Sequence, residues 1–272
     1  MSRNSQTEIL PHPGDLDDPD RPVVAMASDH PGPHRFPFHH HFRAQLVYAV
    51  AGVMTVSTGE GTWVVPPQQA VWVPPGVRHD VKSATSLAMR TLYIHPAATE
   101  GLPRSCCVVT VPPLLKELIL TAVALPAHSS PDSAEARLMA VIPDQLRSLQ
   151  PEPLHLPIPS DRRLRVITDA LSDHPADGRS LADWARTAGA SERTLARLFR
   201  RETGMTFGAW RQRLRLLSAI GRLAEGQSVT SVAFDLGYES PSAFVAMFRR
   251  ELGEPPTRYL RAARKVPSGA VA

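Results

Sequence analysis

The sequence predicts an α+β multidomain protein, in which a small antiparallel β-barrel followed by helices precedes an all-α domain. Short apolar runs rich in β-branched residues occupy residues 44–95, and Gly and Pro separate them at intervals of roughly 8–12 residues, as in sandwiches and barrels. After residue 160 the apolar spacing becomes helical, and proline falls from 22 residues in positions 1–159 to 5 in positions 160–272. The change indicates a boundary between two kinds of domain.

Charge is divided at the same place. The 272 residues have a formal net charge of +4, but residues 160–272 contain 19 Lys and Arg against 12 Asp and Glu, whereas residues 1–159 contain 11 against 14. The basic half is a candidate for binding a polyanion such as DNA. The two cysteines are adjacent, at Cys106 and Cys107, and do not form a disulfide framework. With no signal-peptide pattern and no membrane-spanning apolar run, we expect a cytoplasmic, nucleoid-associated protein without a membrane partner.

The first half is expected to have three parts. Residues 1–37, rich in Pro, Asp and His, predict a flexible segment that leads into the barrel. Residues 38–149 predict the barrel and two helices after it, the second interrupted at Pro143. Residues 150–161, QPEPLHLPIPSD, alternate proline with other residues and predict a stiff extended linker to a helical domain at residues 162–265.

The helical domain contains one arginine-rich hexapeptide twice. FRRETG at residues 199–204 returns 49 positions later as FRRELG at residues 248–253. Each copy closes a unit in which a short helix, a turn glycine and a second helix follow one another, with a serine placed as N-cap of the second helix. Helix, glycine turn and helix is the plan of a helix-turn-helix motif.

The distance between the two units suits duplex DNA. Residues 207–226 predict a continuous helix of about 20 residues, hence ~30 Å long. Successive major-groove openings on one face of B-DNA lie ~34 Å apart. One chain is therefore expected to place its two second helices in neighbouring segments of the groove.

Across about a hundred residues, including the closing GEPPTRYLR at residues 253–261, this pattern resembles the AraC/XylS family of bacterial transcription regulators. The resemblance implies that the second helix of each unit enters the major groove. Base-contact positions of the family fall on Arg193, Ala196 and Arg197 in the first unit and on Pro241, Ser242 and Ala246 in the second.

The chemistry of these positions differs between the units. Arg193 and Arg197 lie one helical turn apart and can offer paired donors to guanine, whereas Pro241 and Ala246 offer little to a base. Base reading is therefore expected mostly from the first unit, with the second as a clamp. The remaining arginines are expected either on phosphates or on a solvated face, and the full set of further expected DNA contacts is Thr194, Arg200, Arg201, Ser240, Arg249 and Arg250.

Two segments of the first half resemble the motifs of cupin barrels. In the opening motif H-x-H is followed by a carboxylate; here His39 and His41 supply the histidines, and Gln45 stands in the carboxylate position. The closing motif P-x-G-x-x-H is matched by Pro74, Gly76 and His79. In the family, a cupin sensor commonly precedes the paired helix-turn-helix units, and helices after the cupin often dimerise; here those helices could equally pack on the barrel.

The three histidines are candidate ligands of a divalent transition metal. Imidazoles two residues apart on a strand point to the same side, and a third can join from a neighbouring strand. The alternative is a set of core histidines, or contacts to an organic ligand, since Gln45 is a poor replacement for a carboxylate. Residues expected to bind the effector are His39, His41, Gln45, Tyr48, Trp72 and His79.

The predicted function is that of a sequence-specific transcription regulator, activator or repressor, that responds to a small-molecule effector and is not an enzyme. No cofactor is required, although a divalent metal could occupy the barrel. The expected partners are an operator duplex, the effector, a second copy of the chain and, for an activator, RNA polymerase. The alternatives are a metal-dependent cupin enzyme with a tethered DNA-binding domain, which Gln45 disfavours, and a non-specific chromatin-type binder.

Overall fold

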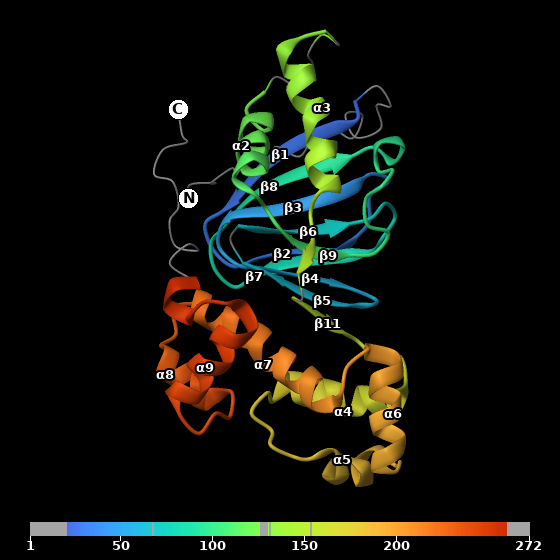
Figure 1. Cartoon of the computed structure of the whole chain (residues 1–272), viewed down its shortest axis with the longest axis vertical. Coiled ribbons are helices and arrows are strands. Elements are labelled where there is room, and N and C mark those ends of the chain that lie inside the picture. Colours follow the sequence, from blue (N-terminus) through green and yellow to red (C-terminus); the bar gives the residue numbers. More distant parts are fainter. Residues whose placement is uncertain (1–20, 67, 126–129, 131, 153, 260–272) are drawn as a thin grey trace, which may run out of the picture. The chain divides into compact units, whose positions relative to one another are not determined.

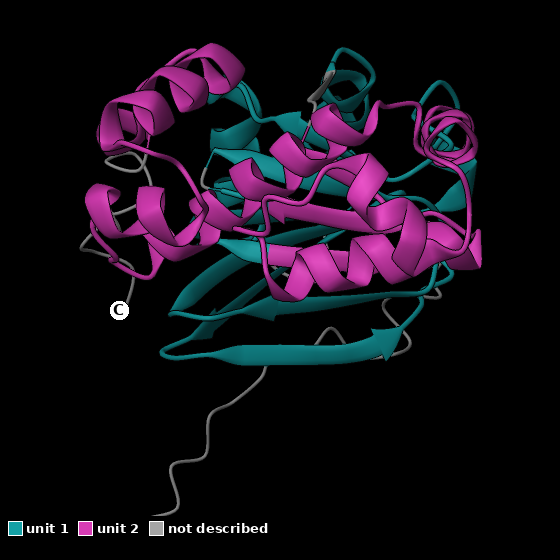
Figure 2. Cartoon of the chain, turned by 90° about the horizontal axis from the view of Figure 1, so that it is seen from below, with its two compact units in different colours: residues 1–54, 65–153 teal, residues 55–64, 154–272 magenta. Residues whose placement is uncertain are grey.

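The structure is a computed structural model that describes residues 21–66, 68–125, 130, 132–152 and 154–259 (Figure 1). Its contacts divide the chain into two compact units, shown in Figure 2. Unit 1 comprises residues 1–54 and 65–153, and unit 2 comprises residues 55–64 and 154–272. No helix in the described part of the chain is both long and apolar enough to cross a membrane.

Unit 1 is built on an antiparallel six-stranded sheet with the order β1-β8-β3-β6-β9-β10. Its strands are β1 (Val23–His30), β8 (Leu87–Ile94), β3 (Ala44–Ala51), β6 (Gln69–Val73), β9 (Cys107–Thr110) and β10 (Pro151–Glu152). A short 3-10 helix, η1 (Pro96–Ala98), follows β8. Strands β2 (His34–His39) and β7 (His79–Ser83) form a further antiparallel pair, in which His39 lies opposite His79.

Helices α2 (Pro113–Ala122) and α3 (Ala134–Arg147) supply residues to the core on one face of the six-stranded sheet. Leu115 of α2 and Ile142 of α3 pack in the same buried cluster as Leu46 and Tyr48 of β3. Since side chains alternate along a strand, Gln45, which directly precedes Leu46, belongs to the other face of β3. The interruption predicted at Pro143 is wrong, because α3 continues through this proline.

Unit 2 contains the helical domain together with three strands. The strands are β4 (Met54–Thr58), β5 (Gly61–Val65) and β11 (His155–Pro157). The helices are α4 (Arg162–Asp173), α5 (Leu181–Ala188), α6 (Glu192–Thr203), α7 (Phe207–Ala224), α8 (Val229–Asp235) and α9 (Pro241–Leu252). In Figure 1, α7 runs from the α4–α6 group to the α8–α9 group.

The expected fold class, an antiparallel β domain followed by an all-helical domain, is confirmed. Both helix-turn-helix units are formed as expected. Gly189 has φ 64° after α5 and Gly237 has φ 77° after α8, conformations that favour glycine. Ser191 and Ser240 are the N-caps of α6 and α9. Helix α7 has 18 residues, which gives a length of about 27 Å.

Two of the predicted segment boundaries differ from the structure. The segment of residues 1–37 is not flexible throughout, because β1 pairs along its whole length with β8 and β2 pairs with β7. The linker of residues 150–161 contains two strands, β10 and β11, which lie at the edges where a sheet tolerates proline. Residues 1–20 and the predicted end of the helical domain at residue 265 lie outside the described residues.

Candidate DNA interface and effector site

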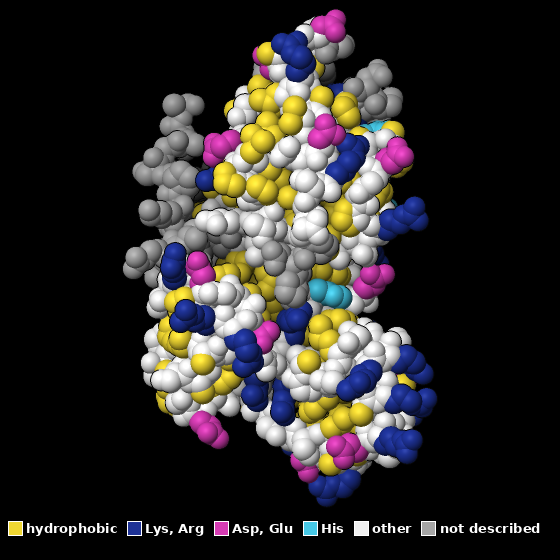
Figure 3. Space-filling model, in the orientation of Figure 1, with side chains coloured by type: hydrophobic (Ala, Val, Ile, Leu, Met, Phe, Trp, Pro, Cys, Tyr) yellow, Lys and Arg dark blue, Asp and Glu magenta, His cyan; other side chains and the backbone are white. Residues whose placement is uncertain are grey.

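The outer face of α6 carries three arginines that have no acidic partner within the described structure. Leu195, Leu198 and Phe199 are buried, so the helix is fixed in the core by one side. On the other side Arg193, Arg197 and Arg200 are exposed, and none of them forms an ion pair with the part of the chain that the structure describes. Figure 3 shows Lys and Arg side chains gathered over the region of α5 and α6. These guanidinium groups are available to bases and phosphates.

The second arginine of each repeated hexapeptide is held by the glutamate after it. Arg201 donates from Nη2 to Oε1 of Glu202 at 2.9 Å. Arg250 makes the same contact with Glu251 at 3.2 Å. The repeat therefore presents one unpaired and one paired arginine, and the paired one is less free to reach a base.

Helix α9 presents small side chains where α6 presents arginines. Phe244 and Phe248 are buried, while Ser242, Ala246 and Arg249 are exposed. The lack of bulk leaves an open hollow of about 740 Å³ lined by Pro241, Ser242, Val245, Ala246, Arg249, Arg250 and Gly253. Such a face lets a helix approach DNA closely but offers few hydrogen-bond donors for reading bases.

Two of the expected DNA contacts have side chains engaged in helix caps. Thr194 Oγ1 lies 2.9 Å from Oγ of the N-cap Ser191. Ser240 Oγ accepts the backbone N–H of Ala243 at 3.2 Å. Both side chains therefore stabilise the starts of α6 and α9. Ala196, between the arginines of α6, is half-buried.

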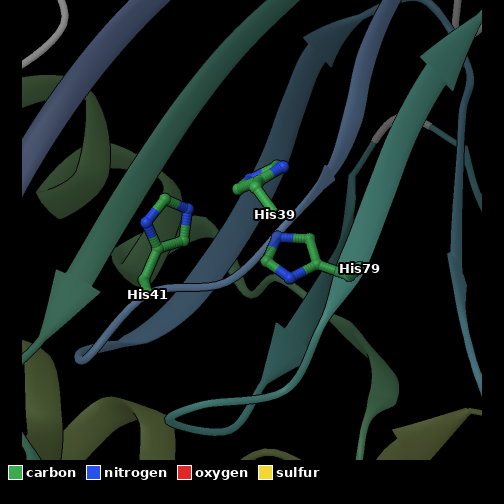
Figure 4. Close-up of side chains that lie close together, drawn as sticks. All are labelled: His39, His41 and His79. Atoms are coloured by element: carbon green, nitrogen blue, oxygen red, sulfur yellow. The ribbon is translucent and has the colours of Figure 1, made fainter.

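In unit 1, the structure brings together the three histidines that the sequence singled out (Figure 4). His39 ends β2, His41 follows in the next loop and His79 opens β7, and their rings face one another. Their ring centroids are 4.4 Å apart for His39 and His79, 4.8 Å for His39 and His41, and 5.7 Å for His41 and His79. The nitrogen atoms available as ligands lie within 4.8 Å of one another.

Backbone carbonyls set which nitrogen carries the proton in two of these rings. Nδ1 of His39 lies 2.7 Å from the carbonyl oxygen of Pro37, and Nδ1 of His79 lies 2.9 Å from that of Val77. A carbonyl oxygen can only accept, so each Nδ1–H donates, and in the neutral ring Nε2 keeps its lone pair. Nε2 of His79 and Nε2 of His41 are buried and have no hydrogen-bond partner among the residues that the structure describes.

Burial favours the neutral form of His41 and His79. Desolvation and the neighbouring histidines lower the pKa of His41 from 6.5 to about 4. Desolvation likewise lowers the pKa of His79, against the opposing effect of its hydrogen bond to Val77. Neutral imidazoles with free lone pairs are the form that binds metals.

Of the other expected effector contacts, Gln45 alone lies next to the cluster. Its Nε2 donates to the hydroxyl of Tyr93 at 3.3 Å, and its Oε1 is buried without a partner. The Tyr93 ring lies 5.1 Å from that of His41, and burial raises the pKa of Tyr93 to about 12. Sequence reasoning missed Tyr93, because only the pairing of β3 with β8 brings it opposite Gln45, 48 residues away.

Tyr48 and Trp72 do not join the histidine cluster, contrary to the sequence-based expectation. Both are almost fully buried in the cluster shared with α2 and α3. Trp72 also donates its indole N–H to the carbonyl of Pro103 at 2.8 Å. They stabilise the domain from the opposite face of the sheet, because the strand alternation separates them from Gln45.

Two family models match this chain. One, described as a helix-turn-helix domain, matches residues 184–262, and the other, described as an AraC-like ligand binding domain, matches residues 21–142. The chain is 38% identical to the HTH-type transcriptional regulator NimR of Escherichia coli (strain K12), over 82% of each chain. It is 36% identical to the HTH-type transcriptional regulator RipA of Corynebacterium glutamicum, over 38% of this chain and 31% of that protein.

A solved structure also matches the helical part. The DNA-binding domain of AdpA, a global transcriptional factor crystallised with a target DNA, is 36% identical, covering 40% of this chain and all of that one, with a TM-score of 0.35. The ligand-binding model, the helix-turn-helix model and the identity to NimR together extend over both units. The chain belongs to the AraC family of DNA-binding transcription regulators, with a ligand-binding domain in its first half.

Proposed function

We propose that the chain is a sequence-specific regulator in which α6 reads operator bases while α9 clamps the neighbouring groove. The observation that carries this proposal is the exposed trio Arg193, Arg197 and Arg200 of α6, which has no acidic partner among the described residues. Guanidinium groups of this kind pair with guanine edges or with phosphates. The small residues on α9 support a positioning role for the second unit.

The first test is a binding selection with the full chain on random duplexes. A regulator of this kind should enrich one motif and bind it roughly 10³-fold or more tightly than unrelated DNA at the same salt concentration. A chromatin-type binder would instead show a steep salt dependence and no preferred sequence. Enrichment of no motif would contradict the proposed function.

For the ligand-binding half, we place the effector site at the cluster of His39, His41 and His79. The chemistry of this donor set fits a divalent transition metal, because burial lowers the pKa of His41 and His79 and their buried Nε2 atoms have no hydrogen-bond partner among the described residues. The carbonyls of Pro37 and Val77 would fix the ring orientation in the way that outer-shell partners do at known metal sites. A bound ion would supply an open coordination position for an effector, with Gln45 and Tyr93 beside it.

Three further parts of the proposal concern partners and location. Leu114 of α2 is 56% exposed and Val141 of α3 is 41% exposed, so these helices offer apolar surface for a homodimer. A DNA-binding regulator works where the chromosome lies, which places the protein in the cytoplasm of its cell. Contact with RNA polymerase would follow if the regulator activates its promoter. A reporter assay with and without the chain would decide between activation and repression.

A further inference from the structure

Residues 154–161, here called the strap, do more than join two domains along the sequence. In unit 2, the strap lies beside the hairpin of residues 55–64, which belongs to the ligand-binding half by sequence. Its strand β11 pairs antiparallel with β5, with Leu156 opposite Thr62. One residue on, the N–H of Ile158 donates to the carbonyl of Glu60 at 3.0 Å. The strap therefore extends the hairpin as an added strand.

The strap fits closely on the hairpin. His155 stacks on Trp63 with ring centroids 4.5 Å apart and an interplanar angle of 13°, and Trp63 is 1% exposed. Gly61 lies next to the ring of His155. A Cβ on Gly61 would collide with Nε2 of His155 and lie 2.8 Å from the carbonyl oxygen of Leu156. The pairing thus depends on the absence of a side chain at this position.

The opposite side of the strap is bound by α7. The buried Trp210 donates its indole N–H to the carbonyl of Pro157 at 2.9 Å. Arg213, one turn later, donates to the carbonyl of His155 at 3.4 Å. Both carbonyls belong to β11. This short strand therefore contacts both the hairpin and helix α7.

The end of the strap is hydrogen-bonded to α6 through Glu202. Oε2 of Glu202 accepts the backbone N–H groups of Ser160 and Asp161, each at 2.9 Å, and the Ser160 hydroxyl at 3.2 Å. Oε1 of the same carboxylate accepts from Arg201. The repeated hexapeptide therefore carries a structural glutamate between its arginines and its glycine, and in the first copy this residue holds the strap.

In the second copy the corresponding glutamate has other partners. Glu251 accepts from Nε2 of Gln212 in α7 at 2.7 Å and from Arg250. The two glutamates have the same sequence context, and each accepts from the arginine that directly precedes it. They differ in that Glu202 contacts the strap and Glu251 contacts α7.

From these contacts we propose that the strap couples the hairpin of residues 55–64 to the first helix-turn-helix unit through Glu202 and Trp210. A change of the hairpin would shift α6, which the proposed function places on the operator. Coupling is reciprocal. An operator bound at α6 therefore stabilises the contacts of the strap with the hairpin by the same free energy by which these contacts strengthen operator binding. The inference rests on the proposed function, since it needs α6 to bind DNA.

Hydrogen exchange of the full chain, with and without its selected operator duplex, tests this coupling and needs no known effector. We expect the operator to slow exchange not only in α6 but also, by about fivefold or more, in peptides that cover residues 58–66 and 154–161. Glu202→Ala removes the acceptor of the Ser160 and Asp161 N–H groups and should abolish the slowing in the hairpin while α6 stays protected. Glu251→Ala makes the same change in the other copy and should leave the hairpin response intact.

Trp210→Phe provides a second variant, because it deletes the indole donor to Pro157 and keeps most of the buried aromatic volume. It should weaken the hairpin response as Glu202→Ala does. Protection of α6 without any slowing in the wild-type hairpin would overturn the coupling and leave the proposed function standing. Equal responses in the Glu202 and Glu251 variants would also overturn it. If no duplex protects α6, the proposed function fails, and the coupling falls with it.

Discussion

At the scale of single residues, neighbouring arginines have different surroundings and therefore different expected tasks. Arg197 is exposed without an ion-pair partner in the described structure, whereas Arg201 donates to Glu202. The sequence alone could not separate them, because both are arginines on one short helix. The distinction depends on Glu202, whose other partners, Ser160 and Asp161, lie some forty residues earlier in the chain.

Replacing Arg197 with Ala should weaken operator binding by about 1–3 kcal/mol and relax the preference at one base pair. The change removes an exposed guanidinium group, which we propose pairs with a base edge, and leaves the buried face of α6 unaltered. A repeat of the binding selection measures both effects. Arg137→Ala, on α3, removes one charge from the other half of the chain and should leave the selected motif unchanged. An unaltered motif for Arg197→Ala would refute the base-reading role.

The histidine cluster gives a second prediction at this scale. The purified chain should bind one Co²⁺ ion, visible by its absorption bands, and His79→Ala should weaken this binding at least about tenfold, since one of three nitrogen ligands is lost. His34→Ala serves as control, because His34 stacks with His30, outside the cluster. Far-ultraviolet circular dichroism checks that both variants fold. Equal Co²⁺ binding by both variants would rule out this site.

At the scale of elements, short sequence patterns correctly predicted those features that depend on interactions between residues close together in the chain. The serine caps, the turn glycines and the apolar face of α6 were all expected from short windows, and all are formed as expected. Strands β1 and β11 were missed, because their partners β8 and β5 lie far away in sequence. Tyr48 and Trp72 were expected to bind the effector for a similar reason, because only the paired strands of the sheet show which face each residue occupies.

Replacing Gly61 with Ala should destabilise the strap, because the new methyl group would collide with His155 and approach the carbonyl of Leu156. Overpacking of this kind costs about 1–3 kcal/mol. Limited proteolysis across residues 150–161 should show faster cleavage. Gly59→Ala, in the same hairpin, meets no atom within 4 Å and provides the matched control. Cleavage at the same rate in both variants would contradict the close fit of the strap.

At the scale of the whole molecule, the charge and proline asymmetry of the sequence already indicated two halves with different partners, the second of them basic. One family model matches an AraC-like ligand binding domain in the first half, and the other matches a helix-turn-helix domain in the second. The structure adds that the hairpin of residues 55–64 groups with the helical unit by its contacts. This grouping could not be predicted from the sequence, because it depends on the pairing of β5 with a strand formed by the proline-rich linker.

We expect one chain to place α6 and α9 in successive segments of the major groove. Hydroxyl-radical footprinting and methylation interference on the selected operator measure this placement. Two contacted groove segments should lie about 10–10.5 base pairs apart on one face of the duplex, with base interference concentrated in the segment that Arg197→Ala affects. A single contacted segment, or two segments on opposite faces of the duplex, would contradict it.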